Sequence, residues 1–196
     1  MDWHSERPAH IVQQREDLTY CAMCTLPYSA HIGRKREIVY DSMKVDFDEI
    51  MLNLRRDAYT LLGSGSGRDV YDIGGGHVAK VAINRRGLAQ NEAEYQIFRR
   101  DDSDLFANII AATSDLRITI MEKAEPLHHF SAVLRYYGVR NDRQLQNIPL
   151  IKRAIAKHSL LFPDLCRVQN WGVVDGRPVI IDYGFTTWVK RRFYSR

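Results

Sequence analysis

The pattern of hydrophobic and polar residues divides the chain at about residue 45. Apolar residues are scattered over positions 1–44, and neither a helical period of 3.6 nor a strand period of 2 persists there. We therefore expect residues 1–44 to form an N-terminal arm or a loosely structured cap. From Val45 onward the pattern becomes regular, so the folded domain is expected over 45–196.

The first regular segment is a predicted helix. Asp46 or Asp48 is suited to cap its start, and we expect it to continue to Leu61–Leu62. Its apolar positions recur at helical spacing, at Ile50, Met51, Leu54 and Ala58.

Two glycine-rich groups follow, at 63–67 and 74–76. Runs rich in β-branched residues flank Gly74-Gly75-Gly76, which predicts a β-hairpin. The earlier group precedes the first full strand of this hairpin and is therefore a separate flexible turn. A second hairpin is expected over 171–182, turned at Asp175-Gly176.

Between the hairpins the pattern predicts one long helix, two short strands and two further helices. We expect the helix over 88–100, the strands at 109–112 and 116–121, and the later helices over 129–137 and 148–161. Strands and one helix followed by helices and a hairpin predict an α+β fold with two lobes.

Composition adds that one domain is enough. The 196 residues are 45% hydrophobic and 27% charged, which is ordinary for a globular protein of this size. No apolar run approaches the roughly 20 residues that span a bilayer, and the first residues lack the apolar core of a signal peptide. We therefore expect no membrane association.

The chain has three cysteines, Cys21, Cys24 and Cys166, too few for a disulfide framework, so we expect a reducing cytoplasm. The spacing Cys21-x-x-Cys24 would supply half of a zinc site, which His4, His10 or His31 would have to complete. Since these histidines have no ligand spacing to one another, two small apolar side chains in a loop are the favoured interpretation.

The positive charge is concentrated in the last third. Residues 128–196 hold 12 Lys and Arg against 4 Asp and Glu, a net +8, whereas 1–50 carry −3 and 51–127 carry −1. Such a region attracts an acidic partner protein, an acidic substrate or a nucleic acid. Near the end, aromatic and basic residues interleave, which suits nucleic-acid binding. We favour a different interpretation over nucleic-acid binding, namely a solvated C-terminal helix whose cations interact favourably with the helix dipole.

Candidate chemistry begins at the first glycine group. Gly63, Gly65 and Gly67 would let backbone N–H groups approach phosphate oxygens closely, because no Cβ intervenes. Lys80 lies in the apolar strand that follows. A lysine there either faces solvent or needs an anionic partner, since burial of an unpaired charge is costly. Glu92 and Glu94 on the next helix are both candidates.

The second half of the chain offers carboxylates near a glycine. Asp182 follows an apolar strand and precedes Tyr183-Gly184, a place suited to holding a metal ion, and Asn170 would add a neutral oxygen ligand. Asp164 would orient or deprotonate a nucleophile. Taken singly, each also fits a turn or a helix cap.

The order of these features resembles the protein-kinase-like superfamily. Residues 62–71 resemble its phosphate-covering loop, with Val70 where that motif has valine, and Val78-Ala79-Lys80-Val81 resembles its strand lysine motif. Three further motifs match. Ile120-Met121-Glu122 resembles the gatekeeper and hinge, Asp164 to Asn170 resembles the catalytic loop, and Asp182-Tyr183-Gly184 resembles the metal-binding motif. The resemblance covers about residues 60–185 and is similar in style to small kinase-like proteins of bacteriophages and bacteria.

The resemblance implies ATP bound between two lobes, an N-lobe over about 45–121 and a C-lobe over about 122–196. Lys80 would contact the α- and β-phosphates, held by Glu94 or less favourably by Glu92. Met121 and Glu122 would lie at the adenine. Asp182 and Asn170 would hold Mg²⁺, and Asp164 would be the catalytic base.

Three departures from the family pattern matter. Arg68 occupies the position of the third loop glycine, and Gly67 comes one residue early. Five residues separate Asp164 from Asn170 where the family has four, and Phe162-Pro163 replaces the preceding His-Arg. Only 12 residues follow Gly184, so we expect a truncated C-lobe without a peptide-substrate groove.

These features support three hypotheses. The leading one is an ATP- and Mg²⁺-dependent phosphotransferase that is not a conventional peptide kinase. The second is a catalytically impaired pseudokinase that binds and modulates a cellular protein, in the host cytoplasm if the chain is phage-encoded. The third is a nucleic-acid-associated binding protein.

Overall fold

The computed structural model describes residues 45–195; the predicted arm at 1–44, with Cys21, Cys24 and the three histidines near them, lies outside the described residues. Helix α1 (Phe47–Arg55) begins after Asp46, whose carboxylate accepts hydrogen bonds of 3.0 Å from the backbone N–H groups of Asp48 and Glu49. The predicted N-cap is thus at Asp46.

The predicted end of this helix at Leu61–Leu62 is wrong. The helix ends at Arg55, and Asp57 then takes a positive φ of 51°, which an α-helix does not accommodate. Both leucines belong instead to the edge strand β1 (Thr60–Ser64), which pairs with the next strand. Their apolar side chains are both about half exposed, so they do not form the buried face of a helix.

The N-terminal half of the described chain is built on a five-stranded antiparallel sheet in the order β1-β2-β3-β5-β4. Strands β2 (Arg68–Gly74) and β3 (His77–Ala82) form the predicted hairpin. Its turn requires glycine, because Gly74, Gly75 and Gly76 have φ between 60° and 78°. Strands β4 (Ile109–Ala112) and β5 (Ile118–Glu122) match the predicted pair.

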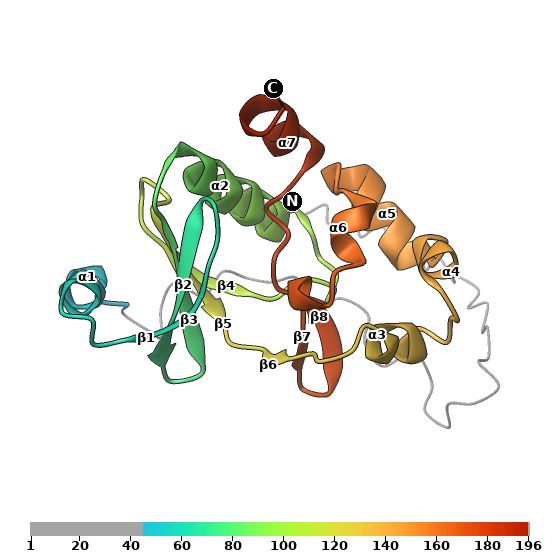
Figure 1. Cartoon of the computed structure of the whole chain (residues 1–196), viewed down its shortest axis with the longest axis horizontal. Helices are drawn as coiled ribbons and strands as arrows, with labels where there is room; N and C mark the ends of the chain where they lie inside the picture. Colours follow the sequence, from blue (N-terminus) through green and yellow to red (C-terminus); the bar gives the residue numbers. More distant parts are fainter. Residues whose placement is uncertain (1–44, 196) are drawn as a thin grey trace, which may run out of the picture. The chain divides into compact units, whose positions relative to one another are not determined.

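Strand alternation gives this sheet two different faces. Ala79, Ile118 and Ile120 point to one face, where Ile50 of α1 completes a small apolar core. Lys80 and Val70 lie opposite each other in the β2–β3 register and point to the other face. Helix α2 (Arg85–Arg100) packs against β3 and β5 on that second face (Figure 1).

After β5 the chain becomes mostly helical. This part of the chain also contains a small antiparallel sheet (Figure 1). Its strands are β6 (Glu125–Pro126), β7 (Trp171–Val174) and β8 (Arg177–Ile180). The helical elements are α3 (Ser131–Tyr136), α4 (Asp142–Gln146), α5 (Pro149–His158), α6 (Phe162–Leu165), the 3-10 helix η2 (Val168–Asn170) and α7 (Thr187–Phe193).

The larger core joins the two halves. It includes Ile97 of α2, Phe106, Trp171 of β7 and Tyr183, all almost fully buried. The second predicted hairpin is present, with its turn at Asp175 (φ 50°) and Gly176 (φ 76°). The architecture is α+β, as predicted.

The remaining differences concern helices. The helices predicted over 129–137 and 148–161 are present but shorter, and α4 and α6 were not predicted. The described residues all belong to one compact unit. Over that part of the chain, every helix is too short or too polar to cross a bilayer.

Candidate active site

The candidate site begins with three side chains on one face of the sheet. Residues two apart on a strand point the same way, so Arg68 and Val70 of β2 share a face with Lys80 of β3. Arg68 is 7% exposed and Lys80 is 5% exposed. Two cations buried on one face require acidic partners.

The partner of Lys80 is Glu94, which α2 carries into the core. The Lys80 ammonium donates to both carboxylate oxygens of Glu94, at 2.8 and 2.9 Å, and to the backbone carbonyl of Ile181 at 2.6 Å. Glu94 is completely buried, whereas the alternative candidate Glu92 is exposed. Burial lowers the pKa of Lys80, and the charge of Glu94 opposes that shift only in part.

Backbone contacts fix Asp182 beside this pair. Strand β8 is tied to the loop before β4, because Ile180 donates its N–H to the carbonyl of Leu105 and accepts from Ala107. Tyr183 is buried and donates its hydroxyl to the carbonyl of Ala107 at 2.9 Å. A Cβ at Gly184 would lie 2.5 Å from the backbone oxygen of Gln90, so only glycine allows this close approach to α2.

The residue that bridges these groups is Arg68. Its Nη1 lies 2.8 Å from Glu94 Oε2, and its Nη2 lies 2.6 Å from Asp182 Oδ1. Burial raises the pKa of Asp182, but the charges of Arg68 and Lys80 outweigh it and leave this pKa below its usual value. We call Arg68, Lys80, Glu94 and Asp182 the ion cluster.

Sequence analysis missed Arg68 and noted it only as an absent glycine. The signal that would have found it is strand alternation, since Arg68 is in phase with Val70 and Lys80. Asn91 was missed as well. It is fully buried, accepts from Arg68 at 3.3 Å and donates to the carbonyl of Leu116 at 2.9 Å, so it anchors the guanidinium to the rest of the lobe.

Asp164 lies in α6, and Asn170 is the last residue of η2. The Asn170 side chain donates to the backbone carbonyl of Asp164 at 2.9 Å, and the backbone carbonyl of Asn170 accepts from the N–H of Ile181 at 2.8 Å. The same carbonyl of Asn170 lies 3.5 Å from the backbone nitrogen of Asp182, which places Asn170 next to the ion cluster. Burial and the nearby charge of Asp182 raise the pKa of Asp164.

The first glycine group forms a turn that packs on the start of α2. The N–H of Gly65 donates to the carbonyl of Arg68 at 2.8 Å, and the carbonyl of Gly67 accepts from Ile83 at 2.9 Å. A Cβ at Gly87 would lie 1.8 Å from the oxygen of Gly67, so the two backbones are in contact. Gly63 has open space around it. Phosphate binding by this turn stays a prediction.

The predicted adenine side of the site is closely packed. Met121 is 1% exposed, and the carboxylate of Glu122 accepts from the backbone and side chain of Asn108, at 2.6 and 2.9 Å. The hydroxyl of Thr119, two residues before Met121 on the same face, is buried and has no hydrogen-bond partner among the described residues. Adenine contacts of Met121 and Glu122 stay a prediction.

The residues present do not fit a divalent metal ion as their side chains lie. Within residues 45–195, no group of three or more His, Cys, Asp or Glu side chains could hold a metal. One oxygen of Asp182 is paired with Arg68, and the amide of Asn170 is turned to the backbone of Asp164. The roles of Asp182 and Asn170 as metal ligands stay a prediction.

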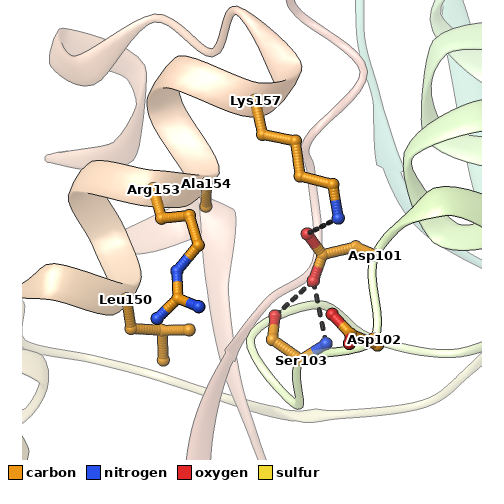
Figure 2. Close-up of a pocket in the computed structure, with 7 residues that line it drawn as sticks. All are labelled: Asp101, Asp102, Ser103, Leu150, Arg153, Ala154 and Lys157. Carbon is orange, nitrogen blue, oxygen red and sulfur yellow. Dashed lines mark hydrogen bonds and ion pairs between the residues drawn. The ribbon is translucent and has the colours of Figure 1, made fainter. Parts of the chain in front are cut away.

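Two hollows lie apart from the ion cluster. One, of about 530 Å³, lies between the start of α2 and α7 and is lined by Asn84, Arg85, Arg86, Arg192 and Phe193. Figure 2 shows the other, of about 70 Å³, between α5 and the loop after α2. It is lined by Asp101, Asp102, Ser103, Leu150, Arg153, Ala154 and Lys157.

No protein-family model matches the chain, and no curated protein matches it. Among solved structures, the chain is similar to the streptomycin–ATP ternary complex of APH(2'')-IIa, with 15% sequence identity, 73% of each chain covered and a TM-score of 0.41.

Proposed function

We propose that the chain binds ATP at the ion cluster and transfers its γ-phosphate to an acceptor other than a groove-bound peptide. The observation that carries the proposal is the buried pair of Lys80 and Glu94, placed beside Asp182. A desolvated lysine held by a carboxylate is suited to bind a phosphate group, because its charge is fixed in position and only partly neutralised.

Four residues would have separate roles in binding and phosphate transfer. Glu94 orients the ammonium of Lys80, which binds phosphate oxygens when it exchanges its contact with the carbonyl of Ile181. Asp164 accepts the proton of the acceptor hydroxyl, and its raised pKa suits a general base. Asn170 positions Asp164 through its hydrogen bond to that residue's backbone.

ATP labelled at the γ-phosphate tests this proposal, with water as the acceptor when no other is supplied. We expect Asp164→Asn to lower release of the label by roughly 10²-fold or more and to leave the Kd for ATP within about twofold. Asp175→Asn, a matched change at the exposed hairpin turn, should alter neither. If the wild-type protein neither binds ATP nor releases the label, the proposal is wrong.

A second candidate function is favoured by the contact between Arg68 and Asp182. An arginine already paired with the predicted metal ligand suits a protein that binds nucleotide without transferring phosphate. The arginines around the hollow between α2 and α7 would then attract an acidic partner protein. Under this alternative ATP binds, but Asp164→Asn changes no measurable turnover.

A further inference from the structure

Arg68 is held more firmly than an incidental surface arginine. Its side chain is 7% exposed, and its guanidinium contacts three acceptors from two parts of the chain, namely Asn91 and Glu94 on α2 and Asp182 after β8. Asn91 is itself fixed by its bonds to backbone carbonyls. The side chain therefore occupies one defined position.

That position is the one in which a cation is needed. Glu94 and Asp182 carry two negative charges, and Lys80 balances only one of them. Arg68 supplies the second positive charge and completes a neutral cluster. A divalent ion added at Asp182 would lie within a few ångströms of the buried guanidinium, and like charges at that distance repel, although the Asp182 side chain itself is 44% exposed.

Arginine is chemically suited to replace a metal here. It stays charged at every physiological pH, and the carboxylates around it raise its pKa further, although burial acts against them. Its planar fork carries five N–H donors, more than the three acceptors that hold it, and the same fork recognises phosphate oxygens. Lys80 and Arg68 together present two fixed cations to an anionic ligand.

We propose that Arg68 is the resident cation at Asp182 and excludes divalent metal ions from this site, so that nucleotide is bound there without Mg²⁺. The part that concerns nucleotide rests on the proposed function. The exclusion of metal concerns the chain's own residues and holds or fails independently of nucleotide.

Binding of Mn²⁺ to the nucleotide-free protein tests the exclusion directly, because free Mn²⁺ is counted by its paramagnetic resonance signal. We expect wild-type protein to bind no Mn²⁺ up to about 1 mM, a range in which weak carboxylate sites fill. Arg68→Gln should bind it at least about tenfold more tightly, and adding Asp182→Asn to that variant should abolish the gain. Arg117→Gln is the matched control, since Arg117 is 75% exposed.

Two results would overturn the proposal. One is wild-type protein that binds Mn²⁺ as tightly as Arg68→Gln and loses it on Asp182→Asn. The other is a folded Arg68→Gln variant, verified by circular dichroism, that gains no Mn²⁺ affinity. If Arg68→Gln does not fold, Arg68→Gly restores the residue type of the family's loop and takes its place.

ATP binding measured with EDTA and with Mg²⁺ separates this proposal from the proposed function. We expect the wild-type Kd to change by less than about threefold between the two buffers, and a tightening of tenfold or more by Mg²⁺ would overturn metal-free binding. If ATP binds in neither buffer while Mn²⁺ behaves as expected, the proposed function fails and the assignment of Arg68 as resident cation stands.

Discussion

Two carboxylate clusters among the described residues differ in how their charges are balanced. In the Asp101 cluster (Asp101, Ser103, Lys157 and His158), one carboxylate at the end of α2 accepts from Ser103 and from the His158 ring at 2.6 Å, with Lys157 at 3.6 Å. In the ion cluster, two carboxylates are matched by two permanent cations.

This difference in charge balance indicates that the Asp101 cluster is a structural contact and that the ion cluster is a candidate binding site. The Asp101 cluster joins α2 to α5, because Ser103 and the α5 side chains of Lys157 and His158 satisfy its one carboxylate. Figure 2 shows the contacts with Ser103 and Lys157. The ion cluster buries the charged side chains of Arg68, Lys80 and Glu94 and leaves that of Asp182 44% exposed. Buried ion pairs of this kind stabilise a fold less than apolar residues of similar volume would. Asp164 and Asn170 lie beside it. A cluster that costs stability and gathers further polar groups is better explained by ligand binding.

The largest expected effect comes from removing the shared anion of the ion cluster. Glu94→Gln leaves Lys80 and Arg68 with a single carboxylate between them, and loss of one partner from a buried ionic network costs about 3–5 kcal/mol. Urea unfolding measures the loss. Glu92→Gln, two residues away and exposed, should change stability by less than about 0.5 kcal/mol. Equal stability of the two variants would contradict the account.

The next effect concerns the glycine turn that leads to Arg68. Gly87→Ala would place a Cβ 1.8 Å from the Gly67 carbonyl oxygen, so one backbone must move, at a cost of about 1–3 kcal/mol. Gly63→Ala meets nothing within 4 Å and is the control. Thermal unfolding should show a lower Tm for Gly87→Ala alone, and matching Tm values would show that the contact is unimportant.

The Asp101 cluster should respond to substitution without affecting the ligand. Asp101→Asn loses the charge that Lys157 and His158 contact, which we expect to cost about 1–2 kcal/mol of unfolding free energy. Its Kd for ATP should equal that of the wild type. Asp102→Asn, on the exposed neighbour, controls for the substitution itself. A higher Kd for ATP in Asp101→Asn would show that the Asp101 cluster also affects ligand binding, which would contradict its purely structural role.

The smallest effect is a pH dependence. Burial raises the pKa of Asp101, but the hydrogen bonds from His158 and Ser103 outweigh it and place this pKa well below its usual value. The unfolded chain therefore binds this proton more readily, so the stabilisation is present above about pH 4 and is lost as pH falls below it. When the pH falls from about 6 to about 3, the free energy of unfolding of Asp101→Asn should decrease by on the order of 1 kcal/mol less than that of the wild type. Parallel curves for the two proteins would contradict the shift.

Local patterns predicted most of the elements but not all their bounds. Both hairpins follow from glycine turns between β-branched runs, and Lys80 was singled out because a lysine in an apolar strand needs a partner. The helix expected to reach Leu61–Leu62 fails because pairing with β2 outweighs a helical period that ends in exposed leucines. Short helices such as α4 and α6 depend on packing, which a sequence period does not record.

The site was predictable only in part for a similar reason. Comparison with the glycine-rich loop motif shows only that Arg68 stands where the motif has a glycine. The role of Arg68 depends instead on contacts with residues up to 114 positions away. Asn91 and the Asp101–His158 contact are equally nonlocal. Sequence spacing indicates which residue types are available, and only the packed structure determines which of them meet.

Thermal unfolding with and without ATP, in wild-type protein and in Lys80→Met, tests the central claim most directly. At an ATP concentration of about 100 Kd, binding stabilises the folded state by about 2.7 kcal/mol, which corresponds to a rise in Tm of roughly 5–10 °C for a chain of this size. The account predicts this rise in the wild type and in the control Lys123→Met, and none in Lys80→Met. No rise in the wild type, or an equal rise in Lys80→Met, would contradict it.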